Sequence, residues 1–594
     1  MPYLAPVKEM VFLLKQIVNL DEIANLPHCQ DATTDVAQAV LEESARLTEQ
    51  VITPLNTVAE KNPPIFKDAR VITSPGFKEA FSAYANGGWQ GLPHEAQFGG
   101  QGLPKSIATG CYEMLHSASM AFALCPMLTD AAIEALITAG SKQQQDLYLP
   151  PLLDGRWTGT MNLTEPQAGS DLAMIRAKAV KQEDGSYRLT GTKIFITYGD
   201  HDYTENIIHM VLARTPDAPE GVKGISLFLV PKILVNSDGS LGERNEVACV
   251  SIEHKMGIHG SPTCVLQYGE QQGAVAYLVG EENRGLEYMF IMMNAARFAV
   301  GVQGIGVAER AYQHAVAYAK DRVQGRGLTA KSSEPIAIIH HPDVRRMLMW
   351  MRANIEGARA LSFLAAGYAD RAKFVEHDDD RSYYKGLYEF CVPLVKAWST
   401  EMAVDVSSQA LQVHGGMGYI EETGIAQLFR DARITTIYEG TTAIQANDLV
   451  GRKTARDAGK VAGQLVEKMN QTIAALRKNT ELQDLADRLQ AGVVDFEAAV
   501  AFVVSHSKTH VNQVFAGSVP YLKLAGITLC AWQMAQSALA AYQMKLANDD
   551  VAFANTKMAT AKFYLQHILP QTSALKIALV EGGDSVMSLD VDAF

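Results

Sequence analysis

The 594-residue sequence has few cysteines, no excess of basic residues and no evident membrane segment. Its seven cysteines are scattered without a Cys-x-x-Cys pair, which gives no zinc or disulfide framework and suits a reducing compartment. The formal net charge of −13 argues against nucleic acid or anionic membranes as partners. We find no apolar run approaching the ~20 residues of a membrane span, and charged residues interrupt the amino-terminal apolar stretch, unlike in a signal peptide. These absences predict a soluble, cytoplasmic protein without integral membrane association or bound metal.

The hydrophobic pattern changes three times along the chain. Apolar residues recur at three-to-four spacing over 1–156, which predicts helices. Short β-rich runs broken by turns fill 157–280 and predict a small sandwich or barrel. Helical periodicity returns over 281–452, and residues 453–594 fit an appended helical bundle. The predicted fold class is therefore mainly α with a central β domain.

Two suggestive motifs favour structural interpretations. The segment 301–306 (GVQGIG) resembles part of a dinucleotide fingerprint, but it lacks the preceding strand, so close helix packing is favoured. His340-His341-Pro342 has no partner at metal-ligand spacing and favours the start of a helix at the proline. His414, beside Gly415 and Gly416, leaves both a structural and a direct chemical role open.

The most informative motif is residues 438–441 (Tyr-Glu-Gly-Thr), which follow an apolar run. A glutamate between a tyrosine and a glycine is an unusual core residue, but it suits a carboxylate half-desolvated beside a ligand. Burial raises the pKa of a glutamate and makes it a usable base near neutral pH. The glycine at 440 lets the backbone approach a ligand closely. The alternative is a helix-terminal acid next to a turn glycine.

Two further segments carry ligand-binding chemistry. Small and hydroxyl-bearing residues at 164–171 (TEPQAGSD) leave donors free for a polar heterocycle edge or a phosphate-bearing tail. The strand 191–197 (GTKIFIT) ends in an aromatic residue and a threonine, which suit the face and the edge of a planar ring. Arg297 and Arg322, near opposite ends of a helical stretch, suit phosphate recognition, although solvated helix arginines are the default.

These motifs occur together, in order, with the segment 411–419 (LQVHGGMGY) and with 430–441 (RDARITTIYEGT). Over about 35–450 the chain resembles the acyl-CoA dehydrogenase family of flavoenzymes. Its extra amino-terminal helix and appended carboxy-terminal bundle are similar to the 3-methylthiopropanoyl-CoA dehydrogenase-like subgroup, which includes enzymes of broad acyl-CoA specificity. The resemblance implies an amino-terminal α bundle, a small β-barrel, a four-helix bundle over 281–452 and FAD as cofactor.

The resemblance also implies roles for individual residues. Glu439 matches the catalytic base, which removes the pro-R α-proton of an acyl-CoA thioester while the β-hydrogen leaves as hydride to FAD. Residues expected to contact FAD are Met161, Leu163, Thr164, Gly169, Ser170, Phe195, Ile196, Thr197, Arg322, Gln324, Gln412, Gly415, Gly416 and Thr441. Arg322 and Gln324, with Gln412, Gly415 and Gly416 from the neighbouring subunit, match contacts to the FAD pyrophosphate and adenosine. Ser170, Arg297 and Gly440 match substrate contacts.

The sequence departs from the family pattern at several cofactor positions. Gly325-Arg326 replaces a common Phe-Gly, and Pro342 and Ala443 stand where glutamines are usual. These changes alter positions that contact the adenine side of FAD in the family. Some members carry their base on an earlier helix, at the position of Ala296 here, so Glu439 has no competitor.

The sequence therefore predicts a homodimeric acyl-CoA dehydrogenase that passes electrons to electron-transfer flavoprotein. The alternative is an acyl-CoA oxidase, in which O₂ re-oxidises the flavin. A third hypothesis is a relative that binds duplex DNA through its carboxy-terminal region. Residues 451–594 contain 14 Lys+Arg against 13 Asp+Glu, which is no electrostatic footprint for phosphates.

Overall fold

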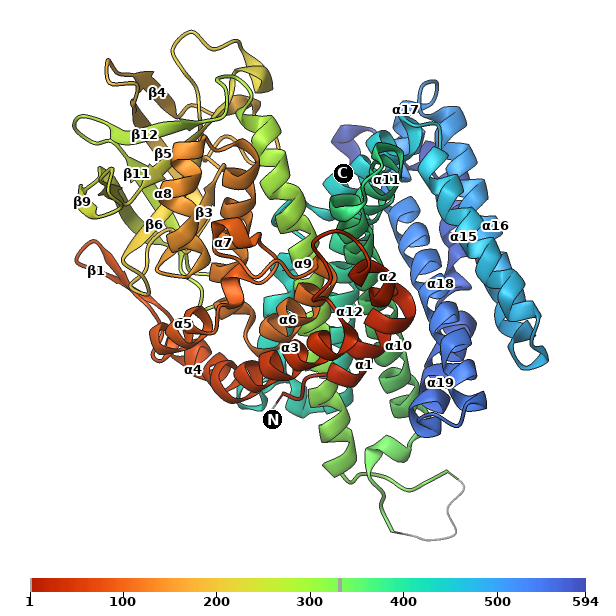
Figure 1. Ribbon diagram of the computed structural model, residues 1–594. Coiled ribbons are helices and arrows are strands. Elements are labelled where there is room, and N and C mark those ends of the chain that lie inside the picture. Colours follow the sequence, from red (N-terminus) through yellow and green to blue (C-terminus); the bar gives the residue numbers. More distant parts are fainter. Residues whose placement is uncertain (1–2, 329–333) are drawn as a thin grey trace.

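The computed structural model describes residues 3–328 and 334–594. Figure 1 shows the long helix α9 (Gly285–Asp321) running through the middle of the molecule. The β-rich region lies on one side of α9 and the carboxy-terminal helices lie on the other. This arrangement confirms the predicted mainly α fold with a central β region and an appended helical region, whereas the three boundaries between the four predicted domains stay predictions.

The amino-terminal region is mostly helical. Its elements are α1 (Val7–Leu13), η1 (Leu14–Val18), α2 (Leu20–Ala24), α3 (Thr34–Leu47), η2 (Thr48–Ile52), α4 (Thr53–Lys61), β1 (Ile65–Lys67), β2 (Arg70–Ile72), α5 (Phe77–Asn86), α6 (Lys105–Ala118), α7 (Met120–Ala139) and α8 (Lys142–Leu153). Helix α8 begins with a capping box in which Ser141 and Gln144 satisfy each other's backbone N–H groups. The two-stranded ribbon β1–β2 was not predicted, because it consists of only two three-residue strands.

The central region is an eight-stranded sheet in the order β10-β11-β5-β12-β7-β6-β3, with β4 beside β5. Its strands are β3 (Trp157–Asn162), β4 (Lys178–Lys181), β5 (Tyr187–Thr197), β6 (Asn206–Ala213), β7 (Ser226–Pro231), β10 (Val247–Ile252), β11 (Thr263–Tyr268) and β12 (Ala274–Val279). The short strands β8 (Ile233–Val235) and β9 (Leu241–Arg244) pair separately. Strand β5 pairs with β4 and β12 near its start and with β11 near its end, so this strand carries its last residues to the edge of the helical region.

Helix α9 contacts α6, α7, α10 (Pro342–Phe374), α12 (Ser399–His414) and α13 (Ile425–Thr435). The remaining elements of this region are α11 (Asp378–Pro393), the π-helical turn η8 (Leu394–Trp398), η9 (Gly415–Tyr419) and α14 (Thr442–Asp448). A Cβ atom at Gly301 would lie 2.3 Å from the Val395 carbonyl oxygen, and one at Gly306 would lie 2.8 Å from the Glu113 carbonyl oxygen. The glycines of 301–306 therefore serve helix packing, as predicted, and α10 begins at Pro342, as predicted.

The appended region consists of η11 (Leu449–Ala455), α15 (Lys460–Arg477), α16 (Gln483–His506), α17 (Val511–Ala516), α18 (Ser518–Leu546), α19 (Val551–His567), α20 (Gln571–Glu581) and α21 (Gly583–Val586). Its side chains share one hydrophobic core with α10, α11 and η8. Buried charges add a second connection. Lys557 on α19 donates to Glu9 on α1 at 2.6 Å and to Glu356 on α10 at 2.9 Å, so the two ends of the chain meet in the interior.

Among the described residues, three helical segments are long and apolar enough by composition to cross a membrane, which corrects the expectation that no segment approaches this length: Met120–Ala139, Gly285–Asp321 and Thr480–His506. In their most apolar windows 83%, 67% and 39% of the residues are buried inside the protein. The first two segments, α7 and α9, pack against each other, and α7 also covers β3. A helix that is apolar all round is expected where protein surrounds it, so α7 and α9 are core helices.

Candidate active site

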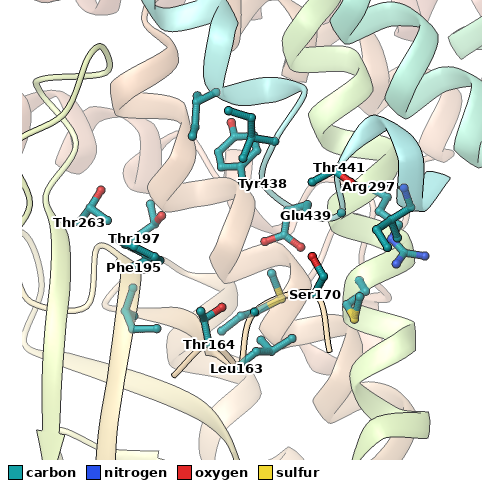
Figure 2. Close-up of a pocket in the computed structure, with 18 of the residues that line it drawn as sticks. Leu163, Thr164, Ser170, Phe195, Thr197, Thr263, Arg297, Tyr438, Glu439 and Thr441 are labelled. Atoms are coloured by element: carbon teal, nitrogen blue, oxygen red, sulfur yellow. Dashed lines mark hydrogen bonds between the residues drawn. The ribbon is translucent and has the colours of Figure 1, made fainter. Parts of the chain in front are cut away.

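A cavity of about 1050 Å³ lies between the sheet and the helices α9, α13 and α14. It gathers most of the site residues predicted from the sequence: Met161, Leu163, Thr164, Gly169, Ser170, Phe195, Ile196, Thr197, Arg297, Glu439, Gly440 and Thr441. These residues come from four separate segments of the chain, 161–170, 195–197, 297 and 439–441. Figure 2 shows Glu439 pointing into the space bordered by Ser170, Thr164 and Phe195.

A strained turn between α13 and α14 carries Glu439. Both Glu439 (φ 53°) and Gly440 (φ 91°) have left-handed backbone conformations, which cost a non-glycine residue of the order of 1–3 kcal/mol unless its surroundings hold it. Thr441 caps α14 by accepting from the Ile444 N–H at 3.3 Å. Gln445 donates to the Glu439 carbonyl at 3.3 Å. The turn thus faces the Glu439 side chain into the cavity rather than along the helix.

Glu439 is half-buried, and its carboxyl group borders the cavity. Burial raises its pKa above the ordinary value, and the positive charges of Arg297 and Lys396 partly offset this rise. The backbone N–H groups of Glu439 and Gly440 donate no hydrogen bond to any described residue. The site therefore combines a partly desolvated acid with free backbone donors.

The turn after β3 forms a second wall and rests on a buried ion pair. Lys193, on β5, donates to the Glu165 carboxylate at 2.8 Å and to the Leu163 carbonyl at 3.0 Å. Burial would raise the pKa of Glu165, but Lys193 and the backbone amides of Arg176 and Ala177 outweigh it and lower that pKa. Breaking a buried pair of this kind costs about 3–5 kcal/mol, so the pair fixes the segment that presents the hydroxyl groups to the cavity.

Phe195 forms an aromatic wall. Its ring is 59% exposed and its φ is +60°, an unusual backbone conformation for a bulky residue. The pairing of β5 with β11 shifts register beside it, and such a bulge redirects a side chain. The hydroxyl groups of Thr164 and Thr197 make no side-chain hydrogen bond within the described part of the chain, although both border the cavity. An aromatic face beside unused donors fits a planar heterocycle, as the flavin ring requires.

Arg297 lies on α9 at the opposite side of the cavity. Its side chain is 5% exposed, and its Nε atom has no hydrogen-bond partner among the residues that the structure describes. Burial lowers the pKa of its guanidinium, while Asp448 and Glu439 act in the opposite direction. A buried, incompletely paired guanidinium that borders a cavity is suited to an anionic or carbonyl-bearing ligand.

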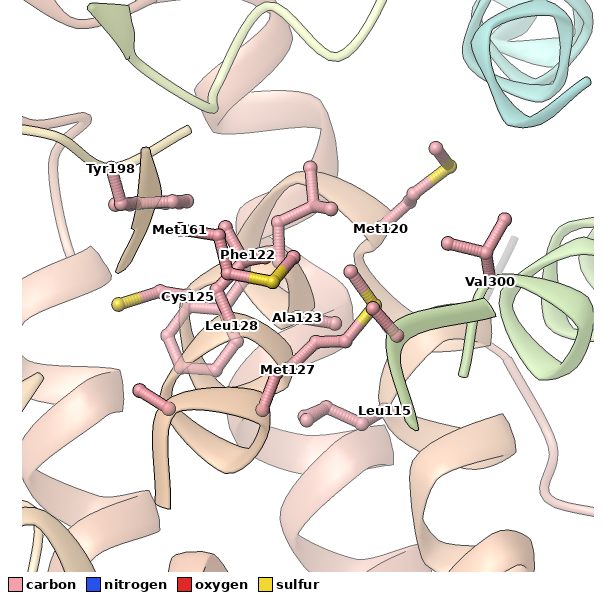
Figure 3. Packing of buried hydrophobic residues seen from close by; sticks show 14 of the residues in the cluster. Leu115, Met120, Phe122, Ala123, Cys125, Met127, Leu128, Met161, Tyr198 and Val300 are labelled. Atoms are coloured by element: carbon pink, nitrogen blue, oxygen red, sulfur yellow. The ribbon is translucent and has the colours of Figure 1, made fainter. Parts of the chain in front are cut away.

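The apolar end of the cavity rests on a closely packed layer (Figure 3). Leu128 and Met161 line the cavity, whereas Met120, Met127 and Val300 belong to the same buried cluster but do not reach it. Methionine side chains adapt their shape more readily than branched ones. The cavity therefore ends in an apolar wall that contains flexible thioethers.

Five predicted cofactor residues lie elsewhere: Arg322, Gln324, Gln412, Gly415 and Gly416 do not line this cavity. All five are exposed. The ring of His414 stacks on that of Tyr318 at 4.4 Å between centroids, which brings the end of α12 to the end of α9. The five predicted cofactor residues therefore lie on one surface, near the ends of these two helices. His414 itself does not line the cavity.

Sequence reasoning missed the groups that support the site. Tyr438 donates to Gln303, and Gln303 meets His116 at 3.3 Å. Burial lowers the pKa of His116 to about 3, so its ring is neutral. Asp431 on α13 accepts from the Ile258 backbone N–H at the cavity rim. These polar residues interrupt apolar helical patterns, a signal that could have identified them as buried partners.

Comparisons with known proteins agree with this geometry. Residues 34–156, 160–270 and 283–454 match the N-terminal, middle and C-terminal domains of acyl-CoA dehydrogenase. The chain is 47% identical to 3-methylmercaptopropionyl-CoA dehydrogenase of Ruegeria pomeroyi, over 99% of this chain and 100% of that protein. The chain belongs to the acyl-CoA dehydrogenase family. Residues 465–590 match a further family region described as acetyl-CoA dehydrogenase C-terminal like.

Two more relatives of this acyl-CoA dehydrogenase are similar over nearly their whole length. A broad-specificity linear acyl-CoA dehydrogenase of Mycobacterium tuberculosis is 34% identical, over 100% of both chains. The structure of an acyl-CoA dehydrogenase complexed with FAD from Bacillus anthracis has a TM-score of 0.74 at 20% identity, and covers 95% of this chain and 92% of that one. The latter supports the fold alone.

The family sets the cofactor and the reaction class. The chain is an FAD-dependent oxidoreductase that dehydrogenates acyl-CoA thioesters. The cavity residues fit this cofactor, because Phe195 supplies a ring face and Thr164 and Thr197 supply unused hydroxyl groups. The resemblance inferred from the sequence motifs is thereby confirmed.

Proposed function

We propose that Glu439 is the base that removes the α-proton of the bound acyl-CoA thioester. The observation that carries this proposal is the position of its carboxylate, which points into the cavity from a left-handed turn opposite Phe195. Its raised pKa makes it a stronger base than an exposed glutamate. FAD, when bound, accepts the β-hydrogen as hydride.

The free backbone N–H groups at 439 and 440 suggest how the thioester is activated. A donor aimed at the thioester oxygen stabilises the negative charge that develops when the α-proton leaves. We assign this role to the Glu439 N–H, which has no partner within the described residues. Ser170 and Arg297 would hold the CoA portion from two sides of the cavity.

For the substrate, we propose 3-methylthiopropanoyl-CoA together with other short or medium linear acyl-CoA thioesters. The support is the name of the relative at 47% identity and the broad specificity named for the one at 34%. The apolar wall around Leu128 and Met161 suits both a thioether and a methylene chain. An apolar pocket discriminates one methylene by only ~1–3 kcal/mol, so we expect turnover of several chain lengths.

We also propose that the protein is a soluble, cytoplasmic homodimer that passes electrons to electron-transfer flavoprotein. The five predicted cofactor residues outside the cavity are exposed and share one surface with Tyr419, which is 91% exposed. In a dimer this surface would reach the partner's FAD. Domain limits at 156, 280 and 452 are part of the same proposal.

The test is a panel of saturated acyl-CoA thioesters, including methylthio and branched types, mixed anaerobically with the purified holoenzyme. Loss of the flavin absorbance with the linear members, and ferrocenium-supported turnover, are the expected results. Hydrogen peroxide produced at a rate matching turnover would favour the oxidase instead. An oxidised flavin that no member of the panel bleaches would refute the proposed function.

A further inference from the structure

Lys396 is a fully buried lysine behind the catalytic turn. Its side chain is 0% exposed, and it forms no ion pair within 4.0 Å among the described residues. Its Nζ donates to the Gly440 carbonyl oxygen at 2.6 Å. Lysine is almost never fully buried unless it is paired, so the position calls for a functional reason.

A local irregularity in the helix holds Lys396 in place. It lies in the π-helical turn η8, directly after Pro393 at the end of α11. Proline has no N–H to donate and disturbs the helical ladder, and single π-helical turns often occur at functional sites. The adjacent Val395 packs against α9 where Gly301 leaves no room for a Cβ. The packing of η8 against α9 therefore fixes the backbone that carries Lys396.

The bond that Lys396 makes is the shorter of the two that the Glu439 and Gly440 carbonyl oxygens accept from described side chains. The other runs from the Gln445 side chain to the Glu439 carbonyl at 3.3 Å. Glu439 has a positive φ, which a non-glycine residue keeps only when its surroundings hold it, whereas Gly440 adopts its positive φ without strain. A charged donor forms a stronger hydrogen bond than a neutral one, and Lys396 is such a donor as long as its amine is protonated.

The charges around Lys396 connect it to the base. The groups that face it are Glu439 on the turn, Arg297 on α9 and Glu401 on α12. Burial lowers the pKa of Lys396 to about 7; Glu439 and Glu401 oppose this change and Arg297 adds to it. Glu401 is held by the Thr442 hydroxyl at 2.6 Å. Below about pH 7 Lys396 is therefore mainly a cation, which favours the ionised form of Glu439.

We propose that Lys396 is a positioning residue whose ammonium group holds the Gly440 carbonyl, and with it the Glu439 turn, and supplies a buried charge that keeps the base ionised. This inference rests on the proposed function, in which Glu439 takes the α-proton. It assigns no contact with the substrate to Lys396, which does not line the cavity.

The test compares four holoenzymes: wild type, Lys396→Met, Lys396→Gln and the control Lys453→Met. Lys453 lies on the π-helical turn η11, pairs with Glu389 at 2.9 Å and does not line the cavity. For each protein the flavin content, the melting temperature and the anaerobic rate of flavin reduction by a saturating acyl-CoA are measured from pH 5.5 to 9.

We expect Lys396→Met to reduce the rate roughly 10- to 100-fold, as for a misplaced catalytic group, with little change in the half-saturating acyl-CoA concentration. The acid limb of its pH profile should move to higher pH, because loss of the cation raises the pKa of Glu439. Lys396→Gln keeps an N–H donor, so it should recover part of the rate but not the acid limb. Lys453→Met should match wild type.

The outcomes separate this inference from the proposed function. A wild-type flavin that no acyl-CoA reduces would refute both. A reducible wild type with a Lys396→Met profile within about twofold of it would overturn the role of Lys396 alone, as would a loss of rate with an unmoved acid limb. If Lys396→Met fails to retain flavin, the pH profile of Lys396→Gln provides the test: an acid limb shifted to higher pH supports the inference, and an unmoved acid limb overturns it.

Discussion

Replacing Glu439 with glutamine should abolish catalysis and stabilise the protein at the same time. The two side chains have nearly the same shape, so packing in the cavity is preserved. Glutamine cannot accept the α-proton, and loss of a general base costs about 10²–10⁴-fold in rate, which equals about 3–5 kcal/mol of activation free energy.

The gain in stability follows from the direction in which the pKa moves on folding. Burial raises the folded-state pKa of Glu439 above its value in the unfolded chain, despite Arg297 and Lys396. Above about pH 4.3 the carboxyl group ionises more readily in the unfolded chain than in the folded protein, so the free energy of unfolding of the wild type falls relative to that of the glutamine variant. Each tenfold difference between the folded and unfolded acid dissociation constants corresponds to about 1.4 kcal/mol. The stability advantage of Glu439→Gln should therefore be near zero at about pH 4.5 and should grow towards pH 8.

Two measurements test this prediction. Anaerobic stopped-flow mixing with acyl-CoA reports the rate of flavin bleaching, and denaturant unfolding at pH 5 and 8 reports the stability difference. Glu439→Asp is the matched control: it keeps the charge but withdraws the carboxylate by about 1.5 Å, and should retain some activity with no stability gain. Bleaching of Glu439→Gln at near wild-type rate, or a lower stability than wild type at pH 8, would refute the reasoning.

Three further predictions concern the surroundings of the site. Phe195→Ala should weaken FAD binding by about 0.5–1.5 kcal/mol through loss of ring stacking; the ratio of flavin to protein absorbance after dialysis measures it, and an unchanged ratio would contradict the aromatic wall. Lys557→Met leaves Glu9 buried without its paired cation and Glu356 with Arg352 alone, and should cost about 3–5 kcal/mol in urea unfolding, with part recovered by adding Glu9→Gln. Burial raises the pKa of Asp431 to about 7, so its contribution to stability is complete below about pH 4 and is lost as the pH rises through 7; Asp431→Asn should flatten this dependence in melting curves, and a parallel curve would refute it.

The sequence predicted the elements with strong periodicity and the motif residues that share the cavity. Strand β5 was recognisable from its alternation, and the position of Glu439 from its neighbours in sequence. Lys396 and Lys193 were not predicted, because their roles depend on carbonyl and carboxylate oxygens supplied by distant segments. The expectation that no segment approaches the apolar length of a membrane span was wrong for a similar reason: α7 is apolar because other elements surround it, and spacing within α7 does not reveal them.

The surface formed by Arg322, Gln324 and the end of α12 stays a prediction of the family resemblance. Its residues are exposed and distant in sequence from the cavity-lining segments. Spacing within one chain carries no information about a contact completed by a second copy, and the substitutions at 325–326 and 342 alter this same surface. Its role therefore depends on assembly rather than on the fold of one chain.

The contact of Lys557 with Glu9 has a consequence for how the protein is made. The first helix emerges from the ribosome more than five hundred residues before the lysine that neutralises its glutamate. Until then, Glu9 has to stay hydrated or protonated, and α1 cannot settle fully against the nascent bundle. We therefore expect the packing of α1 to be completed only after the carboxy-terminal helices have been synthesised.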